Sequence, residues 1–253
     1  MKKTLLVSAL VFVLLFSVFS CDALGMGKAG ALQSLVAPCT GTAYVVTDIS
    51  TEDDPQGLRD QNFSTQDFLK IWYANKVQAE EQVISVGLMK FDLSALKDKE
   101  IKSATLQMFV IRTDFIPDTI GRLVDVSLVD GGFDEGTVTY NSRPTWSAAP
   151  VARSFVYGAG VWCSWDVSAT VAQQAEAGEV AYVTGLLSME DKSEEQILFA
   201  SRHMNDAAPR LLVTYASSAN SGIAWWIWVI GIVVIAVIAF FIGWTINRRK
   251  RSS

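Results

Sequence analysis

Apolar side chains recur at every second position through most of the chain between residues 42 and 216. One such run places Leu106, Met108 and Val110 on the same side of an extended segment. Because successive side chains of a strand point to opposite faces of a sheet, a period of two predicts half-buried β-strands. Similar runs occupy residues 69–73, 83–90, 123–128, 161–167, 180–187, 196–200 and 211–215.

Turn-forming residues separate these runs, among them Gly131–Gly132 and Pro144. Eight or more short strands with turns between them indicate an all-β fold, and in particular an antiparallel jelly-roll sandwich. Residues 42–216 are long enough for one such domain with a substantial core. Residues 168–178 break the pattern, because they are rich in Ala, Gln and Glu. With Ser168 as N-cap and Gly178 at the end, they predict one short helix.

A long uncharged segment follows this domain. Residues 223–246 are 24 positions without a charged side chain. A helix rising ~1.5 Å per residue would extend about 36 Å, enough to cross a hydrocarbon core of ~30 Å with some tilt. The basic tail, residues 247–253, predicts a cytoplasmic C-terminus by the positive-inside rule. Residues 217–222 predict a short hinge. The sequence therefore predicts a single transmembrane helix in the cell membrane, with residues 42–216 on the extracytoplasmic side.

The N-terminus has the features of a secretion signal. Lys2 and Lys3 precede an apolar segment, residues 4–19, and small residues follow it. We expect a signal peptide over residues 1–23, cleaved after Ala23. Lipidation at Cys21 and an uncleaved N-terminal helix remain as alternatives. Residues 24–41 are rich in small side chains and predict a linker.

Charge is unevenly distributed along the chain. Residues 42–217 contain 14 Lys and Arg against 25 Asp and Glu, a net charge of −11, whereas the whole chain carries −5. Binding of nucleic acid depends on Lys and Arg that displace counterions from phosphates. The predicted domain is therefore unsuited to nucleic acid and to other polyanions.

Two cysteines remain beyond the signal region, Cys39 and Cys163. An even number of cysteines in an oxidising compartment is consistent with a disulfide. A bond between these two would close a loop of more than a hundred residues and contribute up to ~4–5 kcal/mol in the chain-entropy description. Two unpaired buried thiols are the alternative.

Five short motifs occur in order along the predicted domain. They are Lys90-Phe91-Asp92-Leu93-Ser94, Ser103-Ala104-Thr105-Leu106, the stretch from Phe133-Asp134-Glu135-Gly136-Thr137 through Val138-Thr139-Tyr140-Asn141, Trp165-Asp166-Val167-Ser168, and Pro209-Arg210-Leu211-Leu212-Val213-Thr214-Tyr215. Together they resemble the DNRLRE-type domain, which is similar to disaggregatase-related domains and to family 96 carbohydrate-binding modules. Phe133 and Tyr140 stand where that family usually has Trp. The resemblance implies a β-jelly roll that is often a non-catalytic module of secreted or cell-surface proteins.

The residues contain no recognisable catalytic motif. His203 is the single histidine of the chain, so a Ser-His-Asp or Cys-His site would have to include it. The adjacent Asp134 and Glu135 are the obvious carboxylate pair for glycoside hydrolysis. The resemblance implies a structural turn at that position instead. We therefore predict that the chain is not an enzyme.

Aromatic side chains are the candidate carbohydrate ligands, because a flat ring covers the apolar C–H face of a pyranose while polar neighbours bind its hydroxyls. Trp72 is the first candidate, since it alternates with Leu69, Ile71 and Tyr73 and so faces away from them. The other candidates lie in loops or at predicted strand ends and are Trp146, Tyr157 and Trp162.

An acidic segment near the start of the domain suggests calcium. Ca²⁺ takes six to eight oxygen ligands, and this segment offers several carboxylates without the regular spacing of an EF-hand. A solvated acidic loop is the alternative. The candidate ligands are Asp48, Glu52, Asp53, Asp54 and Asp60.

These observations predict a membrane-anchored, extracytoplasmic, non-catalytic module that binds carbohydrate at the cell surface. The alternative is a structural or adhesive surface domain that docks another protein and has no glycan site. Exposed aromatics on one sheet face would favour the first, and an exposed apolar patch without converging polar groups would favour the second.

Overall fold

The computed structural model describes residues 31–47, 57–76, 81–114, 116, 120–186, 194–216, 232–235, 237–238 and 244. Leu32–Ala216 form one compact unit, and Met1–Ala31 with Ser217–Ser253 form a second unit. The eleven strands are β1 (Leu32–Ala37), β2 (Cys39–Val46), β3 (Phe68–Lys76), β4 (Glu81–Asp92), β5 (Glu100–Asp114), β6 (Arg122–Leu128), β7 (Ala152–Val156), β8 (Trp162–Asp166), β9 (Glu179–Leu186), β10 (Glu194–Ala200) and β11 (Arg210–Ala216). One α-helix, α2 (Ser168–Gln174), and three single-turn 3₁₀ helices, η1 (Leu58–Asp60), η2 (Ser94–Leu96) and η3 (Ala175–Ala177), complete the described elements.

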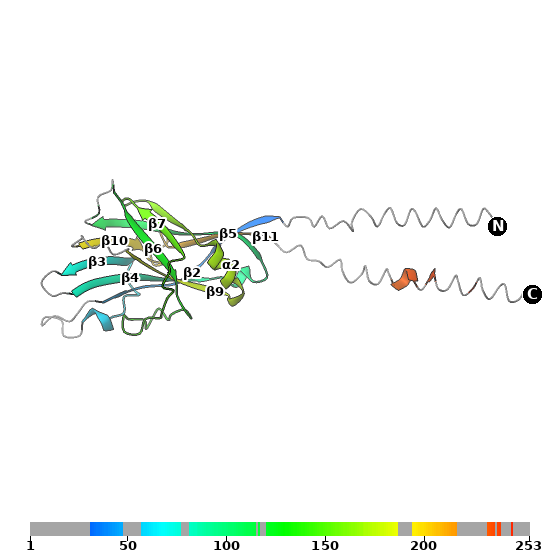
Figure 1. Cartoon of the computed structure of the whole chain (residues 1–253), viewed down its shortest axis with the longest axis horizontal. Helices are drawn as coiled ribbons and strands as arrows, with labels where there is room; N and C mark the ends of the chain where they lie inside the picture. The colour runs from blue at the N-terminus through cyan, green and yellow to red at the C-terminus, as the bar shows by residue number, and fades with distance from the viewer. Residues whose placement is uncertain are drawn as a thin grey trace, which may run out of the picture. The chain divides into compact units, whose positions relative to one another are not determined.

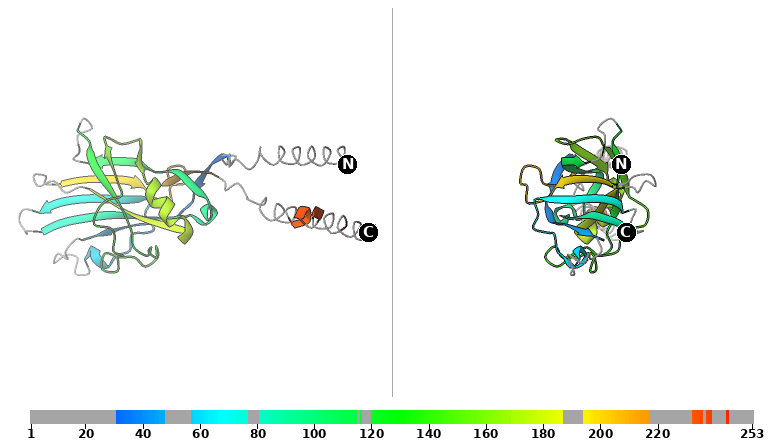
Figure 2. Two further views of the ribbon diagram at one scale, coloured as in Figure 1. Left: turned by 45° about the vertical axis from the view of Figure 1, so that its right-hand side comes forward. Right: turned by 90° about the vertical axis from the view of Figure 1, so that its left-hand side faces the viewer.

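All the described strands join one curled sheet (Figures 1 and 2), and the strand pairs are antiparallel. The strand order is β1-β11-β5-β10-β3-β4-β9-β6-β7, with β2 also paired to β4 and β8 to β5. The 15-residue β5 lets the sheet curl, because its first part pairs with β11 and β8 and its last part pairs with β10. The all-β prediction with one short helix is confirmed.

The curled sheet encloses one large apolar core. Its largest fully buried aromatic side chains are Trp165, Tyr182, Phe91 and Phe199. The indole N–H of Trp165 donates to the Val124 carbonyl oxygen at 3.1 Å. Trp165 packs edge-to-face on Phe199, with ring centroids 6.0 Å apart. We call the buried apolar side chains inside the curled sheet, which include Leu69, Phe91, Leu106, Trp165 and Phe199, the core cluster.

A second apolar cluster lies on the opposite face of β2, β4 and β9. It contains the buried residues Ala43, Val45, Leu88, Val129, Val138, Ala181 and Val183, against which Val86, Phe133, Tyr140 and Trp146 pack. We call it the outer cluster, and residues 129–147, which cover it, the covering segment. Because β2 is buried on both faces, its residues 41–46 form an unbroken buried run rather than an alternating one.

The predicted helix is confirmed over residues 168–178. It consists of α2 followed by η3 and ends at Gly178, whose φ of 82° is in the left-handed region that favours glycine. The predicted Ser168 cap is wrong. The side chain of Asp166 instead accepts hydrogen bonds from the Ser168 N–H at 3.0 Å and hydroxyl at 2.6 Å, so Asp166 organises the turn into the helix.

The compact unit begins earlier than the sequence predicted. Residues 32–41, expected to be part of a linker, form β1 and the start of β2, because β1 pairs with β11 along its whole length. The burial of Ala37 in the core cluster shows that this strand belongs to the fold. The remaining residues assigned to the signal peptide and linker lie outside the described residues, apart from Ala31.

Few of the C-terminal residues are described. In 217–253 the structure describes residues 232–235, 237–238 and 244, which are helical. Among the described residues, no helix is long and apolar enough to span a bilayer. Most of the predicted span, residues 223–246, and all of the hinge and basic tail lie outside the described part of the chain.

The position of β1 leads to a first prediction about domain boundaries. A fragment of residues 32–216 should unfold in one cooperative transition, whereas a fragment of residues 42–216 should lose more than about 2 kcal/mol of unfolding free energy. The shorter fragment lacks the six residue pairs of the β1–β11 ladder, and a backbone hydrogen bond contributes about 1 kcal/mol net. Urea denaturation of both fragments, followed by tryptophan fluorescence, measures the difference; equal midpoints and slopes would contradict it.

Candidate functional site

The four aromatic side chains proposed from the sequence occupy different parts of the sheet. Trp72 is on β3 and Trp162 on β8, while Trp146 is in the covering segment and Tyr157 directly follows β7. Their environments differ in one respect that matters for sugar stacking, which is whether a ring face is open to solvent.

Trp72 is half-buried, and two charged side chains contact its indole ring. The Lys70 ammonium lies 3.9 Å from the centroid of the indole ring, within the range of a cation–π contact. The indole N–H donates to Glu194 Oε1 at 3.1 Å. The prediction that Trp72 faces away from Ile71 agrees with its partial exposure, but its ring and its N–H already have partners within the fold.

Trp162 is in a similar situation. The guanidinium of Arg210 lies 4.2 Å from its ring centroid, and Phe109 packs edge-on against it with centroids 5.5 Å apart. Arg210 also donates to the Asp206 carbonyl oxygen at 2.7 Å, so the cation is held in place. Arg210 and Phe109 therefore cover much of the Trp162 ring.

Tyr157 has the most open ring of the four. It is 53% exposed, and it stacks on Phe155, which is 51% exposed. The ring centroids are 5.8 Å apart and the planes differ by 26°, so the rings are nearly parallel but offset, and each leaves part of a face open. The sequence analysis missed Phe155, although its two-residue spacing from Tyr157 is the signal that would have placed both rings on one face of a strand.

Trp146 is half-buried in the outer cluster. It forms an isolated antiparallel bridge with Val129, which places both side chains on the outer face of the sheet beyond the end of β6. Packing on the outer cluster accounts for one part of its surface, and the Arg143 guanidinium lies 5.8 Å from its ring centroid, so Trp146 is only partly open to solvent. Of the predicted aromatics, Trp146 and Tyr157 are thus brought to the same side of the sheet, along β6 and β7.

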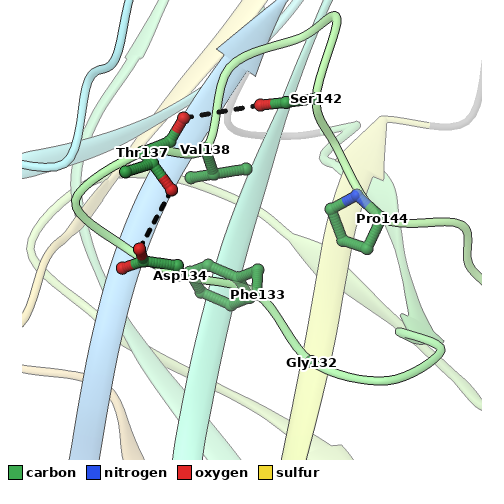
Figure 3. Close-up of a pocket in the computed structure, with 7 residues that line it drawn as sticks. All are labelled: Gly132, Phe133, Asp134, Thr137, Val138, Ser142 and Pro144. Carbon is green, nitrogen blue, oxygen red and sulfur yellow. Dashed lines mark hydrogen bonds between the residues drawn. The ribbon is translucent and has the colours of Figure 1, made fainter.

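The covering segment also forms a shallow pocket of about 230 Å³, lined by Gly132, Phe133, Asp134, Thr137, Val138, Ser142 and Pro144 (Figure 3). The carboxylate of Asp134 faces it but accepts hydrogen bonds from the Gly136 N–H at 3.1 Å and the Thr137 hydroxyl at 3.0 Å. Asp134 thus organises a turn, in agreement with the structural role that the family resemblance implied.

Glu135 anchors the covering segment to the sheet. Its two carboxylate oxygens each accept a hydrogen bond from the Arg202 guanidinium at 2.6 Å, and Oε1 also accepts one from the Thr42 N–H at 2.8 Å. Desolvation raises the pKa of Glu135, but the hydrogen bonds from Arg202 and Thr42 outweigh it, so the pKa lies below its ordinary value of 4.5. A carboxylate held in this way is ionised and already paired, which argues against a role as general acid.

The calcium prediction falls largely outside the described residues. Asp48, Glu52, Asp53 and Asp54 are in residues 48–56, which the structure does not describe. Asp60, in η1, is described, and its Oδ1 accepts a hydrogen bond from the Asn141 side chain at 2.6 Å. The described residues contain no group of three or more His, Cys, Asp or Glu that could hold a metal ion.

Cys39 and Cys163 are free thiols, so the predicted disulfide is not formed and the alternative of two unpaired cysteines holds. The two side chains belong to different parts of the curled sheet. Cys39 lies opposite Phe91 in the β2–β4 ladder, whereas Cys163 lies opposite Met108 in the β5–β8 ladder. Burial raises the pKa of the Cys39 thiol to about 12, which makes it a poor nucleophile.

Comparison with known proteins identifies one matching family. The profile of carbohydrate-binding module family 96 matches residues 54–215, which include nine of the eleven described strands, β3 to β10 in full and β11 up to its last residue. A search of curated proteins finds no match to the chain. The resemblance to family 96 inferred from the five motifs is confirmed.

The anchoring role of Glu135 leads to a second prediction. Glu135→Gln should lower the unfolding free energy by about 1–2 kcal/mol, because it weakens a bidentate charge-assisted pair whose Arg202 side chain is 37% exposed. The matched control is Glu100→Gln, which removes a surface pair with Lys102 and should change stability little.

The pH dependence should have a defined sign. A lowered pKa means that Glu135 stabilises the fold fully above pH 4.5, and that this contribution is lost as the pH falls through the lower pKa of the folded state. The stability difference between the unmodified chain and Glu135→Gln should therefore shrink on acidification. Urea denaturation at pH 7 and at pH 3 measures it; an undiminished difference at pH 3 would contradict this account.

Proposed function

The chain belongs to carbohydrate-binding module family 96, and on that basis we propose that it is a non-catalytic module that binds carbohydrate. The observation that carries the proposal is the family match over most of the compact unit. The open, stacked pair of Phe155 and Tyr157 supports it, since exposed offset rings are suited to the C–H faces of sugars. The ionised, fully engaged Glu135 supports the non-catalytic part of the proposal.

We also propose that the module is tethered to the outer face of a cell membrane by one span. The support comes from the sequence: residues 223–246 carry no charge, Arg248, Arg249, Lys250 and Arg251 follow at once, and the N-terminus has the pattern of a secretion signal. In this arrangement the C-terminus is cytoplasmic, and the short stretch of residues 217–222 keeps the carbohydrate-binding module close to the membrane surface.

The finer description of the fold as a jelly roll is part of the same proposal. It is supported by the antiparallel pairing of distant strands, such as β5 with β10 and β11, and by the enclosed core cluster. Calcium bound by the acidic segment around Asp53 and Asp60 is proposed as a structural ion only, because carboxylates of that segment are the ligands calcium prefers.

A binding experiment tests the proposed function. The full-length chain, in a detergent without a sugar headgroup, should bind at least one member of a panel of neutral and acidic polysaccharides immobilised on a sensor surface. The panel is run once with calcium and once with a chelator, and calcium dependence would support the structural ion. Absence of binding to every polysaccharide under both conditions would contradict carbohydrate recognition and favour the docking of another protein.

Membrane attachment has a separate test. After expression, the chain should sediment with membranes and resist extraction by carbonate at high pH. External protease should digest the epitope-tagged compact unit in intact cells, while a tag after Ser253 should be protected. Recovery of the chain in the soluble fraction, or protection of the compact unit, would contradict the proposed topology.

A further inference from the structure

The outer face of the sheet is covered over only part of its area. The covering segment packs on β2, β4 and β9 through residues such as Val183, which lies opposite Ser127 in the β6–β9 ladder. Two residues farther along each strand, the pair is Asp125 and Gly185. Here the outer cluster ends, and the outward side chains of the β6–β7 ladder are exposed or half-exposed.

The outward side chains of this ladder form a continuous row. Because residues two apart share a face, Leu123 and Asp125 on β6 lie beside their register partners Phe155 and Arg153 on β7. The inward residues between them, Val124 and Val156, are fully buried in the core cluster, which fixes the direction of the alternation. Figure 1 shows the two strands side by side. We call this row, with Tyr157 at one end and Trp146 at the other, the outer strip.

The aromatic end of the outer strip is held rigidly. Gly121 has a φ of 67°, and a Cβ placed on it would lie 2.7 Å from Cδ1 of Tyr157, so the tyrosine ring rests directly on the Gly121 backbone. Phe155 also contacts the ring, in the offset stack described above. A platform that is already ordered loses little conformational entropy when a ligand stacks on it.

The middle of the outer strip is polar but carries no net charge. Arg153 Nε lies 3.0 Å from Asp125 Oδ1, and its Nη2 donates to Oδ2 at 3.3 Å. The Arg153 side chain is 51% exposed, so part of its guanidinium faces solvent and can donate to a hydroxyl group. Gly185, opposite Asp125, has no side chain, and a Cβ placed on it would lie 3.3 Å from Cγ1 of Val86, so Val86 borders the strip at this point.

The far end of the outer strip is Trp146. Its bridge to Val129 places it on the outer face, six residues along β6 from Leu123. Phe155 lies opposite Leu123 and Trp146 opposite Val129, so at ~3.4 Å per residue these two rings are roughly 20 Å apart, and Tyr157 lies two residues farther out. Aromatic rings at both ends with hydrogen-bonding groups between them are suited to an extended chain rather than to one terminal sugar.

We propose that the outer strip binds a neutral polysaccharide along its length, with sugar rings stacked on the Phe155–Tyr157 pair and on Trp146 and with hydroxyl groups bound by Arg153 and Asp125. The inference rests on the proposed carbohydrate-binding function. We expect a ligand without charge for two reasons. Arg153, the only cation of the outer strip, is already paired with Asp125, and residues 42–217 as a whole carry a net charge of −11. Trp72 and Trp162 do not take part, since Lys70 and Arg210 lie 3.9 Å and 4.2 Å from their ring centroids, whereas Arg143 lies 5.8 Å from the ring centroid of Trp146.

The test uses the full-length chain in a detergent without a sugar headgroup, with a neutral glucan, a neutral mannan and polygalacturonate as probes. Tyr157→Ala and Phe155→Ala should each weaken binding of the neutral probe by about tenfold or more, and Arg153→Gln by a smaller factor. Each replaces a side chain that is about half exposed, so the fold should persist, and the urea midpoint of each variant verifies this. Trp162→Phe, on β8 and outside the outer strip, is the aromatic control and should bind as the unmodified chain does.

The outcomes separate this inference from the proposed function. If the unmodified chain binds a neutral probe but folded Tyr157→Ala and Phe155→Ala bind equally well, the outer strip is not the site, although carbohydrate binding stands. Stronger binding of polygalacturonate than of the neutral probes would overturn the ligand class. If the chain binds no glycan but forms a dimer that Tyr157→Ala abolishes, the strip is a protein interface and both proposals fail.

Discussion

The structure depends on one constraint, that β2, β4 and β9 carry apolar side chains on both faces and must be covered on both. The curled sheet covers the inner face by closing around the core cluster. The outer face is covered by residues 129–147, an irregular segment that needs an anchor because it pairs little with the sheet. Glu135 supplies that anchor through Arg202 and the Thr42 N–H. The same carboxylate that the sequence offers to catalysis is therefore committed to the fold.

The limited extent of this cover supports the proposed position of the binding site. Val183 is the last outward residue of β9 in the outer cluster, and at Gly185 there is no side chain left to cover. The adjoining ladder of β6 and β7 then exposes Phe155 and Tyr157, which are more open than any aromatic held by a neighbouring cation. The covering segment thus stabilises the outer face over β2, β4 and β9 and leaves the outer face of β6 and β7 exposed to solvent.

The strands that face solvent on one side were the most predictable from the sequence. Alternation located β5 through Leu106, Met108 and Val110, and all three are fully buried. The start of the domain could not be found in this way. Strand β1 is an edge strand whose residues are mostly exposed, and only Ala37 is fully buried, so its short Leu-Gln-Ser-Leu-Val-Ala sequence has no clear alternation. Its place follows from pairing with β11, a contact between the two ends of the compact unit.

The choice among aromatic residues shows why a binding site is harder to predict than a strand. Alternation correctly turned Trp72 away from Ile71, but the same rule puts Lys70 on the face of Trp72, and the cation covers the ring. For Trp162 no local rule suffices, because Arg210 comes from β11 and reaches it across β5. An aromatic side chain can serve as a sugar platform only where the fold leaves part of a ring face open to solvent. Among the described aromatic residues, the Phe155–Tyr157 pair meets that condition. Its two-residue spacing suggests a shared face of a strand, but only the place of β7 at the edge of the sheet beside β6 shows that this face is open.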